Sequence, residues 1–136
     1  MNEEKIIEGN KLIVKFMEYP QKEQEVYYIQ DHYLLLIDPW KEGFSVTYDI
    51  NIKNMKFIWS FDWIMDVIDK IENLQIPEVS YGFELYIRGN NYVLIKNSRG
   101  DTIVIVDMGT PYGVMSKNEA LFRLVIKFIN WYYKNI

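Results

Sequence analysis

The sequence predicts an α+β domain in which an antiparallel β-sheet, with a three-strand meander, packs against two main helices on one face. Three observations lead to this prediction. Residues 59–72 have helical periodicity, a second helical pattern lies near the end of the chain, and period-two alternation recurs between turn residues in the region between them. A length of 136 residues suits one core, so we expect residues 1–136 to form a single domain.

Composition narrows the classes of function. Hydrophobic residues make up 49% of the chain, which is ample for a core and argues against wholesale disorder. A net charge of −4 gives no general attraction for phosphate backbones, so nucleic-acid binding is disfavoured. Cysteine is absent, which removes disulfides, a thiol nucleophile and the usual zinc sites. A polar start and no long apolar run predict a cytoplasmic protein without a membrane span.

Residues 3–18 form the first predicted element. Apolar pairs recur there at helical spacing, which favours a helix interrupted at Gly9-Asn10. A hairpin with a Gly-Asn turn stays open as the alternative, because apolar residues between 12 and 16 also alternate. Either element ends at Tyr19-Pro20, since proline disfavours a helical conformation in the residue before it. The polar residues 21–25 predict a solvated loop.

Two extended regions are expected next. Val26 to Ile37 is rich in β-branched and aromatic residues and predicts one strand, or two short strands broken near residues 30–32. Turn residues occupy positions 38–43, and a further strand is expected from Phe44 to Ile52. Residues 55–59 are predicted to form a short extended segment leading into the central helix.

The central helix has the clearest start signal. Ser60 is a favoured N-cap residue, and Asp62 falls in the first turn, where the helix dipole favours negative charge. Its polar face is predicted to consist of Asp62, Asp66, Asp69 and Asn73. Its apolar side is predicted to consist of Phe61, Ile64, Met65, Val67, Ile68 and Ile71.

The second half of the chain predicts the meander and the last helix. Three strands are expected over residues 81–88, 92–96 and 102–108, joined by glycine-containing turns. Residues 103–106 are apolar at every position, so that strand is placed inside the sheet or under helices on both faces. A loop is expected at 109–113. Ser116 and Glu119 form a capping-box pattern before a helix from Lys117 to Lys134. That helix is so apolar that it is either clamped between other elements or supplies an oligomer contact.

Three islands of the sequence form a recognisable pattern: residues 10–17, the Ser-Phe-Asp-Trp-Ile-Met-Asp-Val-Ile-Asp-Lys-Ile-Glu segment at 60–72, and Lys-Phe-Ile-Asn-Trp-Tyr at 127–132. In these islands the chain resembles a group of small, functionally uncharacterised proteins of Bacteroidetes and their phages. The group pattern has Trp where this chain has Phe61 and Pro where it has Asp66. The resemblance covers about a third of the chain. It implies a shared architecture and a bacterial or phage source, and it provides no catalytic residues.

The polar residues offer few candidates for catalysis or metal binding. The Asp62, Asp66 and Asp69 face suits a hard cation, yet without a converging second element a solvated helix face is favoured. His32 stands beside Asp31, but adjacency does not make a triad, and no serine lies in a nucleophile elbow. Basic residues near Tyr86 and Tyr92 fit an ordinary outer sheet face better than RNA stacking. The sequence therefore predicts no catalytic, cofactor-binding or metal-binding residue, and no cofactor.

Aromatic residues provide the candidate binding site. Most of them should belong to the core, and any that remain exposed would suit a partner-binding anchor. The residues placed in that site are Trp59, Trp63, Trp131 and Tyr132. The sequence thus favours a non-enzymatic interaction or accessory protein of phage derivation, which binds another protein or itself. The alternative is a small hydrolase or metal-dependent enzyme using Asp31/His32 or the Asp62/Asp66/Asp69 face.

Overall fold

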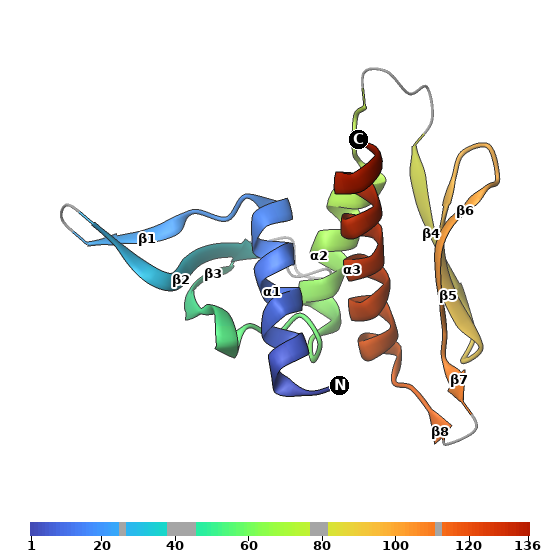
Figure 1. Ribbon diagram of the computed structural model, residues 1–136, viewed down its shortest axis with the longest axis horizontal. Helices are drawn as coiled ribbons and strands as arrows, with labels where there is room; N and C mark the ends of the chain where they lie inside the picture. Colours follow the sequence, from blue (N-terminus) through green and yellow to red (C-terminus); the bar gives the residue numbers. More distant parts are fainter. Residues whose placement is uncertain (25–26, 38–45, 77–81, 111–112) are drawn as a thin grey trace.

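The computed structural model describes residues 1–24, 27–37, 46–76, 82–110 and 113–136. It confirms the α+β class. Three helices lie in the middle of the molecule, with a three-stranded antiparallel sheet on either side (Figure 1). The meander with two main helices on one face is present, and the earlier strands form a second sheet. None of the helices in the described segments is long and apolar enough to cross a membrane.

Helix α1 (Glu3–Met17) replaces the hairpin alternative for the N-terminal segment. The expected interruption at Gly9-Asn10 is wrong, because the helix runs through both residues and buries them. The side chains packed against Gly9 explain why the helix continues through it. A Cβ atom on Gly9 would lie 2.5 Å from Ile126 Cδ1 and 2.6 Å from Phe122 Cζ, so glycine allows α1 to approach the last helix closely.

Replacing Gly9 by alanine is expected to lower the free energy of unfolding by about 1–2 kcal/mol, because overpacking outweighs the gain in helix propensity. The Phe122 ring is fully buried and has little room to move away from the new methyl group. Urea unfolding measures the change. Gly82→Ala is the matched control, since nothing lies within 4 Å of a Cβ atom there. Equal stability of the two variants would contradict the close contact between α1 and the last helix.

The N-terminal sheet has the order β1-β2-β3, formed by β1 (Gln21–Gln24), β2 (Tyr27–Ile37) and β3 (Val46–Asn51). The loop expected at 21–25 is wrong over Gln21–Gln24, because this segment pairs with β2 through its backbone, which polar side chains do not prevent. The break expected near residues 30–32 is a bulge within one strand. There the pairing shifts, and Asp31 has a φ of 58°. Phe44, placed in β3 by the sequence, lies outside the described residues.

The segment before the central helix differs from its prediction. A 3-10 helix, η1 (Ile52–Asn54), is followed by a turn rather than an extended segment. The backbone N–H groups of Trp59 and Ser60 both donate to the Lys56 carbonyl, at 3.0 and 2.8 Å. Met55, Phe57 and Ile58 are buried, and burying all three requires the chain to curl here.

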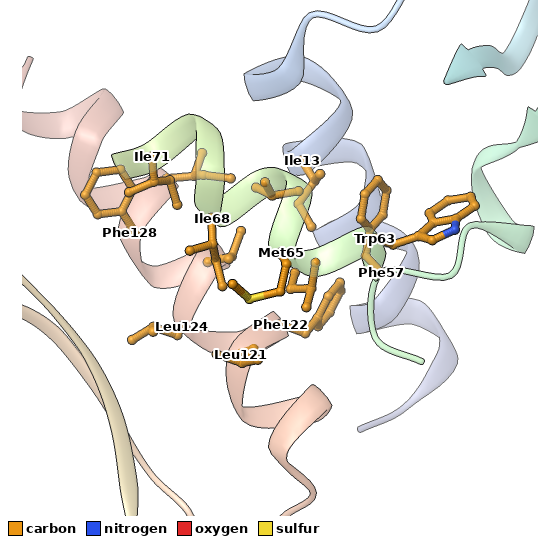
Figure 2. Close-up of a cluster of buried hydrophobic side chains, with 14 of the residues drawn as sticks. Ile13, Phe57, Trp63, Met65, Ile68, Ile71, Leu121, Phe122, Leu124 and Phe128 are labelled. Atoms are coloured by element: carbon orange, nitrogen blue, oxygen red, sulfur yellow. The ribbon is translucent and has the colours of Figure 1, made fainter. Parts of the chain in front are cut away.

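The two main helices begin where the sequence predicts. In α2 (Phe61–Glu72), Ser60 Oγ accepts a hydrogen bond from Trp63 N, and in α3 (Lys117–Asn135), Ser116 Oγ accepts one from Glu119 N. Figure 2 shows Ile68, Met65 and Ile71 of α2 packed beside aromatic and leucine side chains of α3. Helix α3 is clamped between the other helices and the second sheet (Figure 1). On α2, Phe61 departs from the predicted apolar side, since 43% of it is exposed.

The second sheet has the order β4-β5-β6 and confirms the meander, with β4 (Phe83–Arg88), β5 (Tyr92–Asn97) and β6 (Thr102–Asp107). The interior position predicted for residues 103–106 is wrong, because β6 is an edge strand. Val106 faces the core, whereas Ile105 is 40% exposed on the other face. The loop expected at 109–113 contains the short paired strands β7 (Gly109–Thr110) and β8 (Gly113–Val114).

Candidate functional site

Trp59 is the most exposed large aromatic residue in the described part of the chain, with 72% of its surface accessible. Its backbone is nevertheless held on both sides. Trp59 N donates to Lys56 O, and the Trp59 carbonyl accepts a hydrogen bond of 2.9 Å from Asn118 Nδ2 at the start of α3. The preceding Ile58 is buried in the core. The chain therefore presents a free indole ring on a fixed backbone.

Trp63 lies four positions further on and has the opposite environment. It is only 3% exposed, and its ring lies 5.1 Å from that of Phe57 and 4.9 Å from that of Tyr48. Figure 2 shows Trp63 and Phe57 together near one end of α2. This chain buries Trp63 by itself, so the residue offers no contact surface to a partner.

The remaining two aromatic candidates belong to a separate cluster at the other end of α3. Trp131 and Tyr132 are half-buried, with ring centres 5.6 and 6.2 Å from that of Phe128. Asn118, which holds Trp59, and Trp131 are separated along α3 by roughly 20 Å, given the rise of a helix. The structure thus does not unite the four predicted residues in one site.

His32 lies beside Asp49, a residue that is distant from it in the sequence. Its Nδ1 lies 2.8 Å from Asp49 Oδ1 on β3, and Asp49 Oδ2 lies 2.5 Å from Lys22 Nζ. Asp49 lies beside His32 because β2 pairs with β3, and nothing in the local sequence links positions 32 and 49. The arrangement is a charged cluster on the first sheet, and no serine or second acid of the described residues joins it.

The three aspartates of α2 differ in their contacts. Asp66 Oδ2 accepts a hydrogen bond of 3.3 Å from the Tyr19 hydroxyl, whereas Asp62 and Asp69 are exposed. Burial raises the pKa of Tyr19, and the Asp66 charge raises it further, so the phenol keeps its proton and donates it to this bond. Among the described residues, no three His, Asp or Glu side chains gather as metal ligands would.

Two grooves share Ile126 of α3 in their linings. One, with a volume of about 400 Å³, lies against α1 and is lined by Lys5, Glu8, Gly9, Leu12 and Asn130 among others. The other, of about 340 Å³, lies against the end of β6 and is lined by Val106, Asp107, Met115, Arg123, Ile126 and Lys127 among others. Neither contains His32 or the aspartates of α2. Sequence reasoning did not find these grooves, because they arise where distant helices and strands meet.

Comparisons with protein-family models, with curated proteins and with solved structures give no match for this chain. The site therefore has to be interpreted from its own geometry. Within the described residues, that geometry consists of an exposed indole ring on a fixed backbone and two grooves lined by both apolar and charged side chains.

Proposed function

We propose that the protein is a non-enzymatic interaction protein that binds another protein through a surface centred on Trp59. The observation that carries the proposal is the 72% exposure of this indole ring on a backbone held by Lys56 and Asn118. Tryptophan is among the residues most enriched at binding hot spots. The same proposal includes a bacterial or phage source for the protein, which the resemblance to the Bacteroidetes and phage group implies.

Energetics support a role for Trp59 in binding. An exposed indole ring contributes little to folding, yet its burial by a partner would remove a large apolar area from water. Because the hydrogen bonds to Lys56 and from Asn118 already fix the backbone, a partner needs to order only the side chain. Phe61, also exposed, lies two residues further on and extends the apolar surface.

Replacing Trp59 by alanine is expected to weaken partner binding by more than tenfold, a loss typical of a hot-spot residue (about 2 kcal/mol or more). Quantitative affinity purification from a lysate of the source organism would compare the wild-type chain with the variant. Circular dichroism would confirm that the variant is folded.

Tyr133→Ala provides the matched control, because Tyr133 is also an exposed aromatic residue but lies near the end of α3. It should retain the partner. Equal recovery of the partner by the Trp59 variant would contradict the proposal. Sedimentation velocity of the purified chain identifies the special case in which the partner is a second copy.

A further inference from the structure

We propose a second binding site, which does not depend on the Trp59 surface. The free edge of β6, together with the groove beside it, binds an extended acidic segment of a partner protein as a fourth strand of the β4-β5-β6 sheet.

The backbone N–H and C=O groups of Ile105 point away from β5, toward the open edge of the sheet. One position beyond the paired strands, Met108 N donates to Asn91 O, while Met108 O accepts from Met115 N, so the register places the hydrogen-bonded positions of the β5-β6 ladder in phase with Met108 and Asn91. Hydrogen-bonded and non-hydrogen-bonded pairs alternate along an antiparallel ladder, which makes Ile105 opposite Leu94 a non-hydrogen-bonded pair. The N–H and C=O groups of Ile105 therefore face outward, where an added strand would meet them.

Lys127 covers this edge in the unbound chain. Its Nζ donates a hydrogen bond of 3.1 Å to Ile105 O from the exposed side of α3. Lysine at a free edge is a common way to block unwanted strand pairing. An incoming strand would supply an N–H group to the Ile105 carbonyl and release the ammonium. A carboxylate of an acidic segment would then pair with the released ammonium.

The groove beside the edge suits alternate side chains of such a strand. Val106 turns its side chain to the α3 side, so every second residue of an added strand would also face that side. There the side chains would enter the groove of about 340 Å³, whose apolar lining includes Val106, Met115 and Ile126. The site accommodates an aliphatic side chain as well as the backbone.

The positive charge of the groove favours an acidic segment as the partner. Arg123 and Lys127 line it, against one carboxylate, Asp107, among its described lining residues. Arg123 Nε is buried without a hydrogen-bond partner in the described structure, and the contact of its Nη2 with Glu119 Oε1 is long, at 3.7 Å. A second copy of this chain, pairing edge to edge, would bring the same cations together. An acidic segment would satisfy them.

The two proposed sites lie on different sides of α3. Asn118, which holds Trp59, and Lys127 are nine positions apart, which corresponds to about half a turn around the helix axis. A variant at one site therefore leaves the other intact, and the two proposals fail independently.

Selection of short random peptides from a display library, with the full chain as bait, tests the inference. Enriched peptides should carry aliphatic residues together with Asp or Glu at alternating positions. For a synthetic peptide from the selection, fluorescence anisotropy should show affinity reduced by about tenfold or more for the double variant Arg123→Gln/Lys127→Gln. Methylation of alternate backbone nitrogens of the peptide should abolish binding, because the ladder hydrogen bonds are lost. Trp59→Ala should bind it like the wild type.

Several results would overturn the inference. They are a selection without enrichment, enriched peptides that are basic, unchanged affinity in the double variant, and binding that survives backbone methylation. Sedimentation velocity adds one more. If the wild-type chain is a dimer and Ile105→Lys is a folded monomer, a second copy occupies the edge and the acidic segment is excluded.

Discussion

Replacing Trp63 by alanine is expected to lower the free energy of unfolding by about 3–5 kcal/mol. The indole ring is buried, and it lies between Phe57 of the turn and Tyr48 of β3, with ring centres 5.1 and 4.9 Å away. Its loss would leave a cavity at the point where α2, the turn and the first sheet meet. Chemical denaturation followed by circular dichroism measures the change.

Trp59→Ala is the matched control for this variant, since it removes the same side chain four positions earlier. Because Trp59 is largely exposed, its replacement should change the free energy of unfolding by no more than about 0.5 kcal/mol. Similar losses of stability in both variants would mean that the two residues do not divide into a core residue and a surface residue.

Replacing Asn10 by aspartate is expected to lower the free energy of unfolding by about 3–5 kcal/mol at neutral pH. Asn10 is fully buried, and its Nδ2 donates a hydrogen bond of 3.0 Å to Ile52 O, which joins α1 to η1. The aspartate would place a carboxylate against this carbonyl, with no cation beside it in the described structure. The substitution changes charge while keeping the size and shape of the side chain.

This loss should depend on pH with a definite sign. Burial raises the pKa of the introduced carboxyl in the folded state above its unfolded value of about 3.9. The folded chain then binds the proton more tightly, so stability relative to the wild type falls as pH rises between the two pKa values. Below both values, the protonated acid can donate to Ile52 O as the amide does. Urea unfolding of both chains across this range gives the difference.

Asn10→Ala separates the effect of charge from the loss of the hydrogen bond. It leaves the Ile52 carbonyl without its donor, so a loss of about 1–3 kcal/mol is expected, with no added pH dependence. If the aspartate variant showed the same pH profile as the alanine variant, the site would be open to water rather than buried.

The sequence predicted best the elements whose signals are local. Ser60 and Ser116 mark the starts of α2 and α3 because a hydroxyl oxygen accepts from a nitrogen three residues further along the same segment. The β4-β5-β6 meander followed from alternation and glycine turns within a short stretch of chain. These features depend on a few neighbouring residues, which the sequence displays directly.

Features that depend on distant partners were not predictable in this way. The continuity of α1 through Gly9 follows from Phe122 and Ile126, which lie in α3. The apolar run in β6 predicted that both of its faces avoid water, yet Ile105 is 40% exposed, and the run does not show whether another strand lies beside it. In α2, periodicity gives the direction of Phe61 but not how far its neighbours extend, so its exposure was missed. Of the four predicted binding residues, only Trp59 is largely exposed.

The division into two sheets has a consequence for how the chain folds. Each sheet pairs strands that follow one another in the sequence, so each can form from short-range encounters. By contrast, α1 and α3 meet across almost the whole chain, where Met1 N lies 3.3 Å from Glu119 Oε1, 118 positions away. Closing that long loop costs more conformational entropy than closing any one of the hairpins. The docking of α1 would therefore govern the cooperativity of the domain, and native-state hydrogen exchange would detect its release as one unit.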